Sequence, residues 1–205
     1  MFFIGLDLGQ KRDHSAIVLV ERPQVHAYLT RPEKTLQVRL AERVPLGTSF
    51  AEIVDMTGYV AGVANQLMYQ GGRRTQCCLA VDATGLGQPV VEMLRRASTG
   101  WVNGGCQITA VTITGGDRQN YRSGEGGAMN VPKQDLIAGL QVALERRTLR
   151  FPAAMRESGT LKRELLDVRM MRRESGSVKF GAEGKGQHDD LVIALALAVW
   201  RAGRW

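Results

Sequence analysis

Apolar residues in the first 45 positions fall into short segments of the kind that form β-strands. A continuous apolar segment from Phe2 to Leu8 is followed by a polar turn over residues 9–14 and by a second apolar segment from Ser15 to Val20. Apolar and polar residues then alternate from Leu36 to Leu40, a pattern that can extend to Val44. These segments predict a hairpin and a third strand with one solvent-exposed face. Together they would form the antiparallel beginning of a sheet.

The middle of the chain alternates between helical and strand patterns. Apolar residues recur at helical spacing up to about Met68, after Thr48 or Ser49 as the capping residue. Three further elements are predicted by the same reasoning: a buried strand over residues 77–81, a helix over about 89–97 and a strand over 108–113. A strand, loop and helix in succession are typical of α/β folds.

The last third begins with residues 115–130, which are rich in Gly, Asn, Ser and Arg and are predicted to form a mobile loop. Helices are expected to open at Pro132 and near Ser158, with a short extended piece over 149–151 between them. Residues 172–180 are typical of a two-stranded ribbon, and 181–186 of a flexible link. The final segment, 188–202, predicts a helix that is apolar nearly all round and packs closely on the sheet.

Acidic residues stand at the ends of three separate apolar segments. Asp7 and Asp82 each follow a predicted strand, and the pair Asp189 and Asp190 precedes the apolar part of the last helix. Carboxylates in these places can converge on one point, and such a cluster is tolerable mainly if it holds a hard cation. The pattern indicates a phosphodiesterase site that uses Mg2+ or Mn2+.

Each acidic residue also has an ordinary structural explanation. Asp189 and Asp190 can stabilise a helix N-terminus, Asp7 can cap a hairpin turn, and Asp82 can form an Asx turn before glycine. Three such coincidences are less probable together than one metal site. Asp13 is predicted to orient the turn before the second strand, with membership of the acidic cluster as the alternative. His188 can position a water beside the metals, although capping and packing are commoner roles.

The net charge of +7 and a pI near 9.7 favour polyanionic partners. The chain from Arg118 to Lys185 holds 14 basic and 8 acidic residues, so most of the excess lies there, and we expect DNA to cross this half. No recognition helix is evident, so the contacts should be with phosphates and should weaken with salt. The predicted DNA-binding residues are Arg122, Lys133, Lys162, Arg163, Arg172, Arg173, Lys179 and Lys185.

The three cysteines include the adjacent pair Cys77 and Cys78, and they suggest neither a disulfide framework nor a zinc site. Reduced thiols in a reducing compartment are therefore expected. The longest late apolar run, Leu191 to Trp200, is about half of the roughly 20 residues that span a bilayer. A soluble, cytoplasmic protein without membrane contact is predicted.

The motifs around the acidic residues occur in a fixed order along the chain: Gly5-Leu6-Asp7-Leu8-Gly9 with Asp13-His14-Ser15-Ala16-Ile17-Val18, then Val81-Asp82-Ala83-Thr84-Gly85-Leu86-Gly87, Val131-Pro132-Lys133-Gln134-Asp135-Leu136, and His188-Asp189-Asp190-Leu191-Val192-Ile193-Ala194-Leu195-Ala196-Leu197-Ala198. Over nearly the whole chain they resemble the nuclease domain of the large terminase subunit of tailed phages. The resemblance implies an α/β, ribonuclease H-like fold: a mixed central sheet with an antiparallel three-strand start, helices on both faces and a β-ribbon near residues 172–180.

The resemblance also implies a function. It implies endonuclease cleavage of double-stranded DNA with little sequence specificity, in phage genome packaging, by two-metal-ion hydrolysis with Mg2+ or Mn2+. Asp7 would bridge the two ions. Asp82 would complete the coordination of one ion and Asp190 that of the other. Asp189 would be either a further ligand or an acid just outside the metal ligands. The implied partners are a terminase ATPase domain or subunit, a small terminase subunit and a portal, in a phage or prophage protein within the host cell.

No Gly-x-x-x-x-Gly-Lys-Ser/Thr motif is present, so residues 1–205 are expected to form a single nuclease domain without an ATPase. A Holliday-junction resolvase is the first alternative, but such enzymes typically have Glu as the second acid and space the last two acids by a turn. An actin-like ATPase would need a second lobe. A DNA-binding module without catalysis is the remaining alternative.

Overall fold

The computed structural model describes residues 1–9, 13–23, 35–69, 77–85, 87–101, 106–115, 128–172, 178–181 and 188–204. For residues 169–172 and 178–181 it describes the backbone alone. Within these ranges no helix has the length and apolar character needed to cross a membrane.

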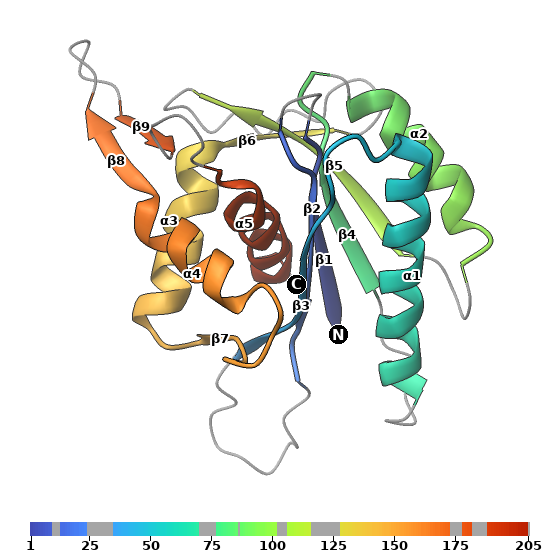
Figure 1. The fold of residues 1–205 in the computed structure, drawn as a ribbon, viewed down its shortest axis with the longest axis horizontal. Coiled ribbons are helices and arrows are strands. Elements are labelled where there is room, and N and C mark those ends of the chain that lie inside the picture. The colour runs from blue at the N-terminus through green and yellow to red at the C-terminus, as the bar shows by residue number, and fades with distance from the viewer. Residues whose placement is uncertain are drawn as a thin grey trace.

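A seven-stranded mixed sheet forms the centre of the molecule, in the order β6-β5-β4-β1-β2-β3-β7 (Figure 1). The first three strands pair antiparallel, and the other four neighbouring pairs are parallel. This is the expected antiparallel start with a parallel extension. The strands are β1 (Phe2–Asp7), β2 (Ala16–Glu21), β3 (Leu36–Arg43), β4 (Cys77–Asp82), β5 (Gln107–Thr114), β6 (Met129–Pro132) and β7 (Leu149–Arg150).

Helices cover both faces of this sheet, as predicted. One face packs against α1 (Phe50–Tyr69) and α2 (Gly87–Ser98), and the other against α5 (Asp190–Gly203), which α3 (Lys133–Glu145) and α4 (Ser158–Asp167) flank (Figure 1). The apolar residues therefore divide into two core clusters, one on each side of the sheet. Strands covered on both faces must be apolar throughout, which explains the continuous runs in β1, β2 and β4.

Helix α5 is almost entirely buried and lies directly on β1. Its Ala-rich sequence allows the close approach, and Gly5 is required for it. A Cβ atom added at Gly5 would lie 1.8 Å from the carbonyl oxygen of Ala194. The contact fixes α5 against the strand that ends in Asp7.

Ser49 caps α1, which settles one sequence alternative. The Ser49 amide donates to Glu52 Oε2 at 2.8 Å, and the Glu52 amide donates to Ser49 Oγ at 3.3 Å. This reciprocal pair is a capping box, and it satisfies two amides that the helix would otherwise leave without partners. Thr48 instead bonds the carbonyl of Pro45 through its hydroxyl.

The expected mobile loop over residues 115–130 is wrong at its C-terminal end. Met129 and Asn130 begin β6, which pairs in parallel with β5 from Val111 to Thr114. A four-residue strand has too little sequence pattern to be recognised, and it forms because the edge of β5 supplies its hydrogen-bonding partner. Residues 116–127 lie outside the described part of the chain.

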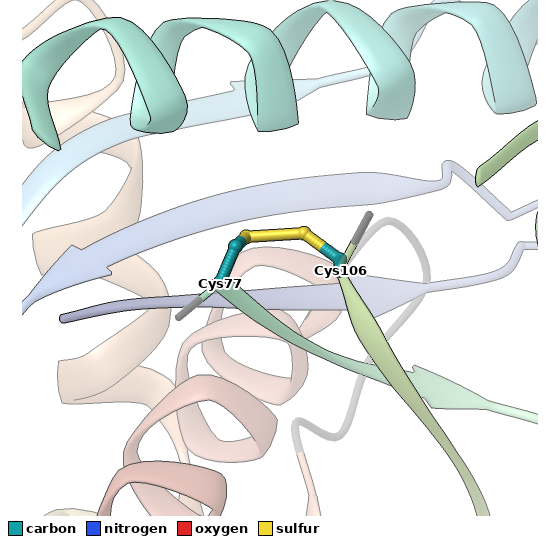
Figure 2. The surroundings of a disulfide bond; sticks show 2 residues. All are labelled: Cys77 and Cys106. Carbon is teal, nitrogen blue, oxygen red and sulfur yellow. A yellow bond between two sulfur atoms is a disulfide. The ribbon is translucent and has the colours of Figure 1, made fainter. Parts of the chain in front are cut away.

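The expectation of three reduced cysteines is also wrong. Cys77 and Cys106 form a disulfide with a Cα–Cα distance of 4.7 Å (Figure 2). Cys78 is a buried free thiol. The register of β4 and β5 explains the pairing: Cys78 lies opposite Gln107, so the residues before them are also neighbours. Adjacency in the sequence is a poor guide because Cys77 and Cys78 point to opposite faces of one strand.

The predicted ribbon is present as a separate two-stranded antiparallel sheet. It consists of β8 (Arg169–Arg172) and β9 (Val178–Gly181), and β8 begins directly after α4 (Figure 1). The ribbon starts three residues earlier than the sequence indicated. Its turn and the flexible link predicted over 181–186 lie outside the described residues, except for Gly181, which belongs to β9.

Candidate active site

The ends of β1 and β4 place two acidic residues side by side. These strands are parallel neighbours with Leu6 opposite Val81, so Asp7 and Asp82 follow at the same edge of the sheet. Parallel strands end at the same edge, and polar side chains gather there because the core ends with them. Helix α5 begins over this edge with Asp190 in its first turn. Three distant parts of the sequence thus supply carboxylates to one region.

The electrostatics of Asp7 show that these carboxylates interact. Burial raises the pKa of Asp7 well above its ordinary value, and the charges of Asp82, Asp190 and Asp189 raise it further. Among the described residues, the Lys133 ammonium opposes them. Among the residues that the structure describes, no hydrogen-bond donor to the Asp7 carboxylate is found. We call Asp7, Asp82, Asp189 and Asp190 the acidic cluster.

Asp82 is held by the loop that follows β4. Its Oδ1 accepts hydrogen bonds from the Thr84 amide at 2.8 Å and from the Thr84 hydroxyl at 2.5 Å, which is the Asx turn that the sequence allowed. Thr84 Oγ1 in turn accepts from the amide of Ile113 at 2.9 Å. Burial raises the pKa of Asp82, and these bonds oppose the rise. The turn uses Oδ1 and fixes the direction of the carboxylate.

Asp189 and Asp190 do not cap their own helix. Asp189 is the N-cap residue of α5, but its side chain makes no capping hydrogen bond. Its Oδ2 instead accepts a 2.6 Å hydrogen bond from Lys133 Nζ, at the start of α3. Both acids lie at the N-terminus of α5, as their ordinary explanation requires, but their carboxylates also face the cations Lys133 and Arg43 from other elements.

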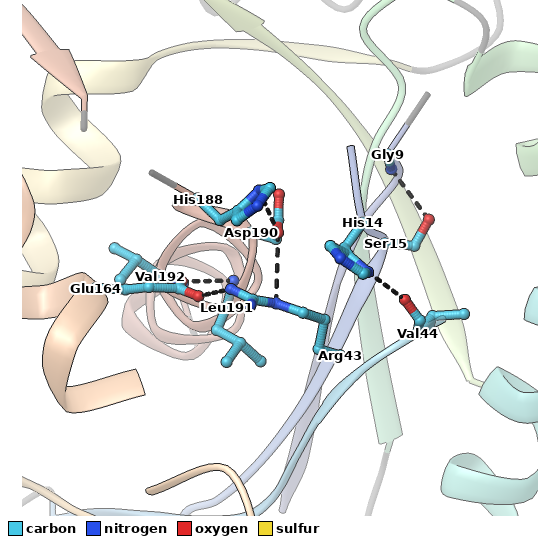
Figure 3. A network of polar contacts seen from close by, with 10 residues as sticks. All are labelled: Gly9, His14, Ser15, Arg43, Val44, Glu164, His188, Asp190, Leu191 and Val192. Carbon is cyan, nitrogen blue, oxygen red and sulfur yellow. Dashed lines mark hydrogen bonds and ion pairs between the residues drawn. The ribbon is translucent and has the colours of Figure 1, made fainter. Parts of the chain in front are cut away.

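The capping group of α5 comes from α4. Glu164 Oε2 accepts hydrogen bonds from the amides of Leu191 at 3.0 Å and Val192 at 3.3 Å (Figure 3). Glu164 is buried and is also paired with Arg43. Burial raises the pKa of Glu164 to about 7, although Arg43 and the amide donors lower it.

Asp190 is surrounded by basic groups but keeps one oxygen without a partner. Arg43 Nε lies 3.6 Å from Asp190 Oδ2, and His188 Nδ1 lies 3.8 Å from the same atom. Both distances exceed hydrogen-bonding length, and Asp190 Oδ2 is buried without a hydrogen-bond partner among the described residues. Burial raises the pKa of Asp190, while Arg43 and His188 lower it. A buried carboxylate oxygen of this kind is available to a ligand.

The acidic cluster has side chains of the type that bind a metal ion, but they are not arranged around a common point. In the described residues, no three His, Cys, Asp or Glu side chains surround one point closely enough to hold an ion. The cluster nevertheless has the chemistry of a hard-cation site: three carboxylates that raise the pKa of a fourth, Asp7, and a buried carboxylate oxygen without a donor among the described residues. Lys133 supplies positive charge inside the cluster.

His14 is a neighbour that sequence reasoning did not single out. Its Nδ1 lies 2.8 Å from the carbonyl oxygen of Val44, which only accepts, so Nδ1 is the donor of this hydrogen bond. The ring meets His188 edge to face, with centroids 5.4 Å apart (Figure 3). The Gly9 amide donates to Ser15 Oγ at 3.0 Å and so supports the same turn.

The remaining predicted residues lie in different environments. Asp13 is exposed at the bend before β2 and is not among the carboxylates that raise the pKa of Asp7. Lys133 lies within the acidic cluster, and Lys162 and Arg163 are exposed on α4. Arg172 and Lys179 lie on β8 and β9, where only the backbone is described. Arg122, Arg173 and Lys185 lie outside the described residues.

Arg43 and Glu164 were missed because their roles depend on distant contacts. Glu164 carries the one available signal: it lies three residues after Leu161 on the helix face that packs inward. A charged residue on such a face needs a buried partner. No comparable signal marks Arg43, which ends a strand with alternating exposure.

Comparison with known proteins supports the fold. No family model and no curated protein matches the chain. Solved structures do: the large terminase nuclease of thermophilic phage G20c is 21% identical, with TM-score 0.60, covering 98% of this chain and 82% of that one. The human cytomegalovirus terminase nuclease domain, soaked with Mn and bound to an inhibitor, has 10% identity and TM-score 0.63, covering 97% of this chain and 81% of that one.

A third match carries a metal. The g2p large terminase nuclease domain of bacteriophage SPP1, with bound Mn, has 11% identity and TM-score 0.53, with coverage of 98% of this chain and 85% of that one. The expected ribonuclease H-like fold of terminase nuclease domains is therefore confirmed.

Proposed function

We propose that this chain is a metal-dependent endonuclease that cleaves double-stranded DNA with little sequence specificity, in phage-type genome packaging. The observation that carries the proposal is the acidic cluster: β1, β4 and the start of α5 bring four carboxylates together, and burial and the charges of the other three raise the pKa of Asp7. A cluster of this kind at a sheet edge is costly unless a cation is bound. The shared fold with terminase nucleases, some of them solved with magnesium or manganese, supports the same interpretation.

Asp7, Asp82 and Asp190 would hold Mg2+ or Mn2+, with Asp189 as a further ligand. Ions held by these residues would supply the chemistry of two-ion hydrolysis, which is activation of the attacking water and stabilisation of the leaving 3'-oxygen. Asp7, at the end of the central strand β1, would be shared between them. Asp82 is oriented by Thr84, which bonds its Oδ1. No covalent enzyme intermediate is needed.

Lys133 has a proposed role beyond binding DNA. Its ammonium pairs with Asp189 and lowers the pKa values of Asp7 and Asp82, so it lies between the carboxylates of both strands and the helix. It balances part of the negative charge before substrate arrives. In this proposal the same ammonium would also contact the scissile phosphate. His188, 3.8 Å from Asp190, is the candidate for positioning a water.

DNA would lie across the half of the chain that carries the basic excess. Lys162 and Arg163 on α4 are exposed and belong to this surface, as does the ribbon that follows. We propose a single nuclease domain over residues 1–205. Its partners would be an ATPase domain or subunit, a small terminase subunit and a portal. Activity would be weak unless such partners hold the nuclease against DNA.

Cleavage of supercoiled plasmid tests the proposal. The intact chain, Asp7→Asn and Asp190→Asn are each incubated with plasmid in Mn2+, in Mg2+ and in EDTA. Asp55→Asn is the matched control, because Asp55 is an exposed acid on α1, on the opposite face of the sheet from α5. Nicking and linearisation should require metal, persist in the control and disappear in the two cluster variants.

Other outcomes separate the alternatives. Binding of DNA that weakens with salt, without cleavage in any metal, would favour a binding module. Selective, symmetric cutting of four-way junctions would favour a resolvase. Retained cleavage in Asp7→Asn would mean that the site has been misplaced.

A further inference from the structure

Glu164 holds the end of α5 that carries the acidic pair. It is the only described side chain found to bond the first amides of this helix, those of Leu191 and Val192. The side chain is 6% exposed, so water cannot easily replace it. The amides belong to the two residues that follow Asp190. The position of that carboxylate therefore depends on α4, a separate element.

Arg43 connects this cap to Asp190. Its Nη2 donates to Glu164 Oε1, so the two oxygens of Glu164 have different partners: the helix amides on one side and Arg43 on the other (Figure 3). The Arg43 Nε atom lies 3.6 Å from Asp190 Oδ2. A planar guanidinium held at one end has little freedom at the other. Glu164 thus aims Arg43 at Asp190.

Arg43 is close enough to Asp190 for electrostatic attraction, but the distance between them is too long for a hydrogen bond. Arg43 Nε and Asp190 Oδ2 are both buried and both lack a hydrogen-bond partner among the described residues. The Asp190 side chain is 8% exposed. Arg43 can therefore hold the carboxylate in place by charge while leaving the oxygen available to a ligand.

We propose that Glu164 and Arg43 are positioning residues for Asp190, an inference that rests on the proposed nuclease function. Glu164 fixes the first turn of α5, and Arg43 orients the Asp190 carboxylate toward the acidic cluster. In this role neither residue would touch the DNA or the metals. Because the pair joins β3, α4 and α5, it sets the distance between a helix-borne ligand and the strand-borne Asp7.

Metal affinity distinguishes this role from a purely electrostatic one. Removing the positive charge of Arg43 should strengthen cation binding if Arg43 acts only through its charge. If it positions Asp190, binding should weaken, and removal of such an outer partner typically costs about 10- to 100-fold in affinity. The two explanations thus predict opposite signs.

The test is calorimetric titration of Mn2+ into the full chain and its variants, without DNA. We expect Arg43→Gln and Glu164→Gln to raise the Mn2+ dissociation constant about 10- to 100-fold, and Arg43→Lys to restore part of the affinity. Glu164→Gln keeps the side-chain volume and a carbonyl acceptor, so the fold should survive. The control is Arg39→Gln, on the same strand, where Arg39 pairs with Glu21 at the surface. In plasmid cleavage, kcat should fall while KM for DNA stays unchanged.

Hydrogen exchange of the Leu191 and Val192 amides is a second readout that needs no metal. Exchange should be faster in Glu164→Ala than in the intact chain and the Arg39→Gln control. Unchanged exchange, or unchanged or tighter Mn2+ binding in both Gln variants, would overturn the inference. If the intact chain binds no Mn2+ and cuts no DNA, the proposed function fails instead, and the positioning role falls with it.

Discussion

Replacing Asp7 by Asn is expected to make the metal-free protein more stable while abolishing its activity. The pKa of Asp7 is raised well above its ordinary value of 3.8, first by burial and then by three neighbouring carboxylates. The folded state therefore binds this proton more tightly than the unfolded state does. The corresponding stability is present below pH 3.8 and is lost as the pH rises through the raised pKa. Asn cannot ionise, so the variant avoids this loss.

The size of the effect follows from the charges in the cluster. The four acids of the cluster and Glu164, when ionised, face the cations Lys133 and Arg43, which leaves a formal excess of three negative charges. At an effective dielectric constant of about 20, two like charges about 8 Å apart repel by about 2 kcal/mol. Removing one charge should stabilise the metal-free fold by about 1 to 3 kcal/mol. A gain of about 2 kcal/mol corresponds to a rise in Tm of about 4 to 8 °C.

Thermal denaturation at pH 8, in EDTA and in Mn2+, measures both halves of this prediction. At 100 times its dissociation constant, Mn2+ should stabilise the intact chain by about 2.7 kcal/mol, and Asp7→Asn should lose most of that response. Asp55→Asn, at an exposed position on α1, is the control for replacing an acid by its amide. A lower metal-free Tm for Asp7→Asn, or an undiminished response to Mn2+, would refute the reasoning about the cluster.

Two further predictions concern the fold. Gly5→Ala should lower the free energy of unfolding in urea by about 3 kcal/mol or more, because the new Cβ meets the Ala194 carbonyl; Gly139→Ala, in open space on α3, should cost nothing and gain up to about 1 kcal/mol. Reducing the Cys77–Cys106 disulfide, which closes a 29-residue separation, should lower that free energy by about 3 to 4 kcal/mol. Equal losses at both glycines, or no effect of dithiothreitol, would contradict these predictions.

Sequence periodicity predicted most of the elements because each buries a regular face. The continuous apolar strands and the apolar last helix correspond to β1, β2, β4 and α5 within about two residues. The sheet edge at β6 was missed because four residues carry almost no period and depend on β5 for their pairing. The disulfide was missed for a related reason: it depends on the register between two strands. Local sequence does not contain this information.

In the candidate site, too, some residues could be predicted from local sequence, and others depend on contacts between distant segments. Asp7, Asp82 and Asp190 could be found because acids directly after or before apolar segments lie at the ends of elements. Their supporting groups could not be found this way. Arg43 and Glu164 are 121 residues apart and meet only when β3 and α4 are both in place against α5. Lys133 was predicted as a DNA contact, and its partner Asp189 became evident only from the packing of α3 beside α5.

The charge balance of the cluster bears on how many ions the free chain can hold. With Glu164 counted, Lys133 and Arg43 leave an excess of three negative charges among five acids, and one divalent ion would neutralise two of them. A second ion would leave one surplus positive charge in a partly buried site, a cost that the negative scissile phosphate offsets. We therefore expect one tight Mn2+ per chain in calorimetric titration without DNA. Two tight ions without DNA would show that the two cations move away from the acids, and that charge balance does not limit occupancy.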